Sequence, residues 1–176
     1  MPELFHVEHV AKVRCFGRAA ALDGLTQPAG TLCGRIAPDE VVFVGAPGTA
    51  AALVEDLEAQ LAQEGTAALV VDHTDGWGFV SLAGKGLEEV WARVSAVRLP
   101  DADPSGATCF TVGKVCDVAA KVFVRPGRVD VMYGAEVRRH VGDRFEHVGH
   151  AVGLHTVRAP KDDPVGVRAA GSEVPA

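Results

Sequence analysis

Residues 69–148 carry a regular succession of strand, turn and helix signals, which constrains the fold more than any other feature of the chain. Two segments place apolar side chains on one helix face by their i, i+3, i+4, i+7 type of spacing. These are Leu87, Val90, Trp91 and Val94, and then Val137, Val141, Phe145 and Val148. A helix with one apolar face buries that face, so both helices are expected to lie on a sheet.

Strand signals flank these helices. We expect residues 67–73 and 77–83 to pair as a hairpin, because Asp75-Gly76 is the residue pair that type I′ turns favour. Alternating apolar positions resume at 109–112 and 118–125. Pro126-Gly127 then predicts a turn back into residues 128–133, because Pro fixes φ and Gly supplies positive φ. The order strand, helix, hairpin, helix predicts a ferredoxin-like layer.

The first half of the chain repeats this plan in weaker form. Residues 10–16, 31–36 and 41–44 are expected to be extended, with a turn at Pro38-Asp39. A helix follows, with Ala50, Leu53, Leu57 and Leu61 on its apolar face, and Gly65 ends it. The whole chain is therefore predicted to be an α+β fold of two ferredoxin-like halves, with helices packed on antiparallel sheets in a single compact domain.

We place this domain at residues 1–155. Residues 156–176 mix prolines, glycines and charges without periodicity, and we expect a flexible C-terminal tail. The 176 residues include no run of roughly 20 apolar residues, so no membrane span is expected. The start of the chain lacks a secretory signal, which predicts a cytoplasmic location. Four cysteines without a C-x-x-C pair are then expected to be reduced.

Charge and motif content exclude several classes of function. With 17 basic and 23 acidic residues the net charge is −6, and no basic cluster suggests a nucleic-acid partner. Neither G-x-G-x-x-G nor G-x-x-x-x-G-K-[ST] occurs, so no phosphate-binding loop is expected. No nucleophile elbow occurs, and Cys109 and Cys116 are interpreted as buried, inert thiols.

Histidines and tryptophans each allow two interpretations. Pairs at His6 and His9 and at His147 and His150, with His140 and His155 nearby, have the spacing of metal ligands. Zinc sites normally need three or four ligands and a supporting second shell, so we expect no metal. Trp77 and Trp91 are interpreted as anchors of the core or of an interface, not as platforms for bases or flavin.

Three segments resemble a known family. They are residues 35–45 (RIAPDEVVFVG), Val71-Asp72-His73-Thr74 and residues 80–84 (VSLAG). Their order is similar to that in the small gamma subunit of heterotetrameric sarcosine oxidase, and in the wider group of the glycine-cleavage T protein and related folate-binding domains. In that group a D-x-S strand end precedes a strand, a glycine and a helix; here Asp72-His73-Thr74 and residues 82–86 match those positions.

One segment departs from the T-protein pattern. There, a glycine pair and two aspartates precede a strand, and one aspartate serves folate-dependent one-carbon transfer. The matching residues 113–118 have Lys114 in place of one glycine and Cys116 in place of one aspartate. Asp117 is the remaining carboxylate, so it is the one weak catalytic candidate of this chain. An aspartate before a strand is also commonly a solvated or turn-capping residue.

The resemblance implies a small, non-catalytic scaffold subunit of a flavin-dependent oxidase of sarcosine or another secondary amine. This chain would bind no cofactor or metal. The larger flavoprotein subunits would hold FAD, FMN, NAD and tetrahydrofolate, and release glycine, hydrogen peroxide and a one-carbon unit. Two alternatives stay open: a stand-alone tetrahydrofolate-binding one-carbon-transfer module acting through Asp117, and a non-enzymatic interaction domain.

Overall fold

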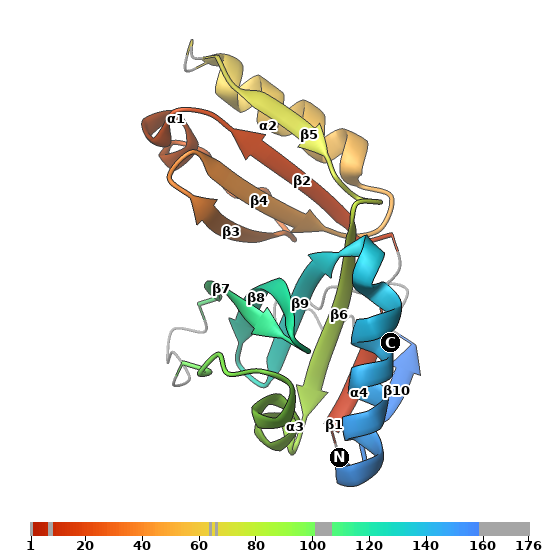
Figure 1. Ribbon diagram of the computed structural model, residues 1–176. Helices are drawn as coiled ribbons and strands as arrows, with labels where there is room; N and C mark the ends of the chain where they lie inside the picture. Colours follow the sequence, from red (N-terminus) through yellow and green to blue (C-terminus); the bar gives the residue numbers. More distant parts are fainter. Residues whose placement is uncertain (1, 7–8, 64, 66, 101–106, 159–176) are drawn as a thin grey trace, which may run out of the picture.

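The computed structural model describes residues 2–6, 9–63, 65, 67–100 and 107–158 (Figure 1). Its elements are β1 (Pro2–His6), β2 (Ala11–Phe16), α1 (Ala19–Asp23), β3 (Leu32–Ala37), β4 (Glu40–Gly45), α2 (Ala50–Gln63), β5 (Leu69–Asp72), β6 (Trp77–Gly84), α3 (Leu87–Val94), β7 (Cys109–Val115), β8 (Val118–Arg125), β9 (Arg128–Gly134), the 3₁₀ turn η1 (Ala135–Val137), α4 (Arg138–Val152) and β10 (His155–Arg158). None of the described helices combines the length and the apolar character needed to cross a membrane.

The described strands form two sheets. One sheet has six strands in the order β10-β1-β6-β9-β8-β7, and the other has four in the order β3-β4-β2-β5. All pairs are antiparallel except β1 with β10, which run parallel. The prediction of a single compact α+β domain with helices on antiparallel sheets is therefore confirmed, with that one parallel pair added.

The layers follow from the alternation of side chains along the strands. α3 and α4 cover one face of the six-stranded sheet, and α1 and α2 cover one face of the four-stranded sheet (Figure 1). The two remaining faces meet in a third core, where Val42 and Val44 pack with Phe79 and Phe123. This contact is close, because a Cβ on Gly34 of β3 would lie 2.3 Å from the ring of Phe110 on β7.

The predicted hairpin between residues 67–73 and 77–83 is wrong, although both strands exist. β5 pairs with β2 in one sheet, whereas β6 pairs with β1 and β9 in the other. Asp75 and Gly76 lack the positive φ values of a type I′ turn. Gly76 is needed for space instead, because a Cβ there would lie 2.5 Å from the His73 ring. The segment carries the chain from one sheet to the other.

The helix predictions are confirmed at the level of single residues. Leu87, Val90, Trp91 and Val94 are all buried along α3, and Leu53, Leu57 and Leu61 along α2. The turn at Pro126-Gly127 also forms as expected, with Gly127 at φ 67° between the paired Arg125 and Arg128. Both tryptophans are core residues, with Trp77 7% and Trp91 3% exposed.

The strands at the two ends of the chain were not expected from the sequence. β1 pairs with β10, so the sheet extends three residues past the predicted domain boundary at His155. Residues 159–176, which make up most of the predicted flexible tail, lie outside the described residues. That part of the prediction stays a prediction.

Candidate functional site

Asp117, the catalytic candidate, lies in the two-residue turn that joins β7 to β8. Cys116 has φ 51° and Asp117 φ 68°, so this turn has the two positive φ values of a type I′ hairpin. The Asp117 side chain is 80% exposed and forms an ion pair of 3.5 Å with Arg144 of α4. Its position is that of a solvated turn residue, which favours that interpretation over catalysis.

The residues around this turn serve the fold. His140 Nε2 donates a hydrogen bond of 2.8 Å to the Cys116 carbonyl, and the Cys116 N–H donates to Val94 O at 2.6 Å. Burial raises the pKa of the Cys116 thiol to about 12; Arg144 lowers this pKa and Asp117 raises it. A thiol with so high a pKa is not a nucleophile at neutral pH. The turn thus gathers Cys116, Asp117 and His140 without an activated group.

The other residues singled out in the sequence lie apart. His147 and His150 are exposed on α4, and among the described residues no three His, Cys, Asp or Glu side chains gather as a metal site. All four cysteines are free. The expectation of burial holds for Cys116 but is wrong for Cys109, which is exposed because it begins the edge strand β7.

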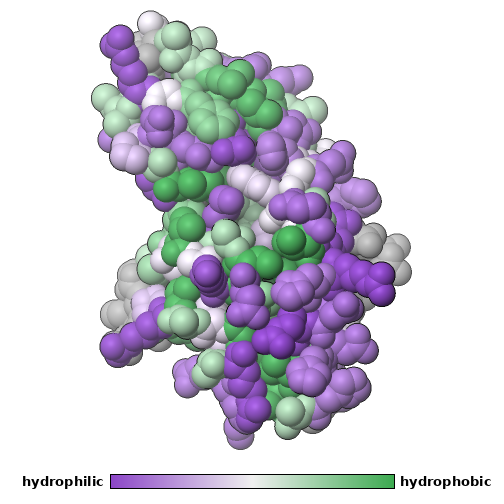
Figure 2. Space-filling view, viewed as in Figure 1, coloured by the Kyte–Doolittle hydropathy of each residue, from purple (hydrophilic) through white to green (hydrophobic). Residues whose placement is uncertain are grey.

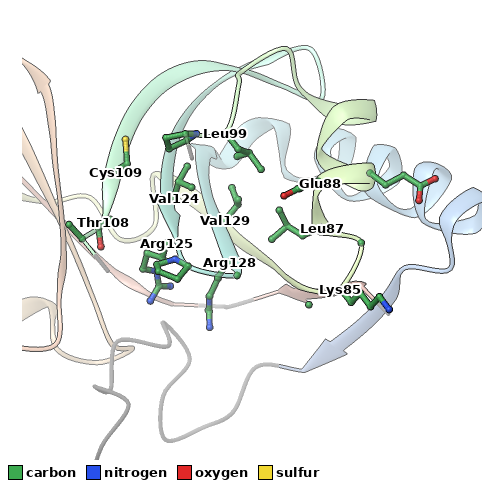
Figure 3. A pocket seen from close by; sticks show the side chains of 17 residues that line it. Lys85, Leu87, Glu88, Leu99, Thr108, Cys109, Val124, Arg125, Arg128 and Val129 are labelled. Atoms are coloured by element: carbon green, nitrogen blue, oxygen red, sulfur yellow. The ribbon is translucent and has the colours of Figure 1, made fainter. Parts of the chain in front are cut away.

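A pocket of about 850 Å³ opens between the start of α3 and the β8–β9 hairpin (Figure 3). Leu87, Leu99, Val124 and Val129 surround the hollow, and this volume falls within the range of small-molecule sites. Asp117 is not among its lining residues. It lies beyond the other end of β8, roughly 23 Å away at about 3.3 Å per residue. The pocket and the candidate carboxylate are therefore not parts of one compact site.

A buried carboxylate organises the polar groups beside this pocket. Asp130 is fully buried and receives Arg125 Nε at 2.9 Å, Arg128 Nε at 3.0 Å and the Ser81 hydroxyl. Arg128 Nη2 also donates to Ser81 Oγ at 2.8 Å. In Figure 3 both guanidinium groups point away from the apolar hollow. The cluster ties β6, β8 and β9 together across the sheet.

A second polar cluster lies where the two sheets meet, around the ring of Trp77. The Arg14 guanidinium carbon lies 4.9 Å and Lys121 Nζ 4.4 Å from the centre of this ring, distances typical of cation–π contacts. Arg14 Nε also donates to Glu40 Oε1 at 2.8 Å. The His73 ring lies 4.8 Å from Trp77, and burial, Arg14 and Lys121 lower the pKa of His73. This joint is electropositive.

Lys12 anchors the segment that crosses between the sheets. It is 2% exposed, and its ammonium donates to Thr74 O at 2.6 Å. Burial and the charge of Arg138 lower the pKa of Lys12 to about 8, with Asp75 and Asp72 acting in the opposite direction. Thr74 N–H donates to Asp72 Oδ1 at 2.9 Å. The Asp72-His73-Thr74 motif thus has a structural role, holding the crossover in shape.

The sequence analysis missed Lys12, Lys121 and Asp130. Each stands in an otherwise apolar strand, and a charged residue in such a strand signals a buried polar cluster. That signal was available in the sequence for Asp130, which lies between Val129 and Val131. The partners were not available, since they come from other strands.

Comparisons with known proteins identify two relatives in structure. A chain of heterotetrameric sarcosine oxidase from a Corynebacterium species has a TM-score of 0.67 and 16% identity, over 88% of this chain and 86% of that chain. Glycine cleavage system aminomethyltransferase T from Bartonella henselae has a TM-score of 0.58 and 14% identity, over 89% of this chain and 47% of that chain. At such identities the likeness establishes a shared fold.

The chain spans about half the length of that aminomethyltransferase. No protein-family model matches the sequence, and no curated protein is significantly similar to it.

Proposed function

We propose that this chain is a small, non-catalytic scaffold subunit of a flavin-dependent amine oxidase of the sarcosine oxidase type, acting in the cytoplasm. The likeness that carries the proposal covers 88% of this chain and 86% of a chain of a heterotetrameric sarcosine oxidase. It therefore accounts for most of both chains. The likeness to the aminomethyltransferase covers 47% of that enzyme, which favours a subunit over a complete transferase.

The placement of the candidate groups supports a scaffold role. Asp117 is a solvated turn residue paired with Arg144, and the pocket beside α3 has an apolar interior. Burial raises the pKa values of the Cys15 and Cys116 thiols to about 12, which leaves both protonated at neutral pH. In the proposed complex the larger subunits hold FAD, FMN, NAD and tetrahydrofolate and oxidise a secondary amine such as sarcosine. This chain contacts and orders them.

Purification of the chain from its source organism with an affinity tag at native expression tests the proposal. We expect larger chains to co-purify, with a flavin absorption spectrum and sarcosine-dependent formation of hydrogen peroxide. The isolated recombinant chain serves as the control and should be colourless and inactive, because it has no nucleotide-binding motif. A tagged chain that elutes alone, or with partners that carry no flavin, would contradict the proposal.

The tetrahydrofolate-module alternative makes a different prediction for the same isolated chain. It requires the chain to bind tetrahydrofolate without any partner. Isothermal titration calorimetry with tetrahydrofolate separates the two: saturable binding favours the module, and its absence favours the scaffold.

A further inference from the structure

The β7–β8 hairpin is cationic, although the chain as a whole is acidic with a net charge of −6. Its two strands contain Lys114, Lys121 and Arg125 and neither Asp nor Glu. The single acid of the connecting turn, Asp117, pairs with Arg144 of α4. Positive charge is therefore concentrated on one hairpin at the edge of the six-stranded sheet.

Part of this hairpin is not covered by the four-stranded sheet. Val112 stands opposite Lys121 in the antiparallel register, so both side chains share the face on which Phe110 contacts β3. Val112 is nevertheless 53% exposed, and Lys114 on the same face is exposed. In the space-filling view the outline of the molecule narrows where the two sheets meet (Figure 2).

Lys121 is the cation of this face without a counter-ion among the described residues. Arg14 is bound by Glu40, whereas the Lys121 ammonium forms no ion pair or hydrogen bond there and contacts the Trp77 ring. Burial and Arg14 lower the pKa of Lys121; Glu40 and Glu136 act in the opposite direction.

The ammonium of Lys121 also reaches solvent. Arg144 Nε is the one buried side-chain polar atom of the described residues that lacks a partner, so the Lys121 nitrogen is not sealed in the core. The Trp77 ring holds the ammonium in place, which reduces the entropy lost when an anion binds. An exposed apolar side chain, Val112, lies beside it. A carboxylate flanked by apolar atoms complements such a surface.

We propose that Lys121, held against Trp77 and flanked by Val112, binds the carboxylate of an Asp or Glu side chain from a larger subunit of the complex. This inference rests on the proposed function, because it needs a partner chain. It assigns the uncovered face of the β7–β8 hairpin to the interface. Lys121 acts there as a binding residue, not as a catalytic one.

Lys121→Met removes the charge and keeps most of the side-chain length. With the co-purifying subunits immobilised, we expect the variant to bind about tenfold more weakly than the wild type, mainly through a slower association rate. Its affinity should also depend less on salt, because one ionic contact is lost. Biolayer interferometry at several salt concentrations measures both effects.

Two matched variants complete the experiment. Lys121→Arg keeps the charge and should bind within about threefold of the wild type. Lys85→Met removes an exposed lysine at the start of α3, away from the hairpin, and should leave the affinity unchanged. Thermal denaturation checks that each variant folds. Equal affinity of wild type and Lys121→Met overturns this inference alone, whereas no wild-type binding to any flavoprotein subunit overturns the proposed function as well.

Discussion

Replacing Trp91 with Ala should reduce the free energy of unfolding by about 3–5 kcal/mol, the largest single effect expected in this chain. Trp91 is 3% exposed in the core between α3, α4 and the six-stranded sheet, and its Nε1 donates to Val97 O at 2.7 Å. α3 has eight residues, too few for an isolated helix to be stable, so it depends on this packing. Urea denaturation of the purified chain measures the loss.

Trp91→Phe is the matched control for this prediction. It keeps an aromatic ring in the core but removes the hydrogen bond to Val97, so we expect a loss of about 1–2 kcal/mol. If Trp91→Ala changed the free energy of unfolding by less than about 1 kcal/mol, the packing of α3 described above would be wrong.

Asp130→Ala should destabilise the fold by about 3–5 kcal/mol, because it leaves a cluster of cations beside the sheet without their buried carboxylate. Asp130 accepts from Arg125, Arg128 and Ser81, and all three lose a partner in the variant. The arginines retain some contact with solvent, with side-chain exposures of 11% and 17%, so the lower end of the range is expected. The midpoint of urea denaturation should fall accordingly.

Asp130→Asn separates the charge from the hydrogen bonds. The amide keeps one acceptor oxygen at nearly the same volume, and we expect a smaller loss, about 1–2 kcal/mol. Equal stability of Asp130→Ala and the wild type would show that the two arginines do not need this carboxylate.

Local patterns were sufficient to predict most helices and strands. The apolar stripe at Leu87, Val90, Trp91 and Val94 depends only on spacing within one segment, and it is buried as expected. The turn at Pro126-Gly127 likewise follows from the dihedral preferences of its own two residues. Such features need no knowledge of which strands are neighbours.

The pairing of strands was less predictable. Asp75-Gly76 favours a hairpin locally, but β5 and β6 find better partners in two different sheets. The type I′ turn occurs instead at Cys116-Asp117, where the residue types give little warning of positive φ. A tight hairpin between Val115 and Val118 imposes it there.

The polar clusters could not be assembled from the sequence, because their members are distant in the chain. Arg14, Trp77 and Lys121 come from β2, β6 and β8, and they meet only because the two sheets pack face to face. The sequence did identify Asp117 as a candidate. It could not show that the carboxylate would lie on an exposed turn facing Arg144.

The most direct measurement of the central claim is the turnover of sarcosine by the purified complex carrying Asp117→Asn in this chain. Asn tolerates the positive φ of this position, and a surface substitution shifts stability by no more than about 0.5 kcal/mol, so the complex should assemble normally. The scaffold account predicts wild-type rates of both hydrogen peroxide formation and one-carbon transfer to tetrahydrofolate. A loss of about 10²-fold or more in either rate, in a complex of normal stability, would identify Asp117 as an acid–base residue and contradict the account.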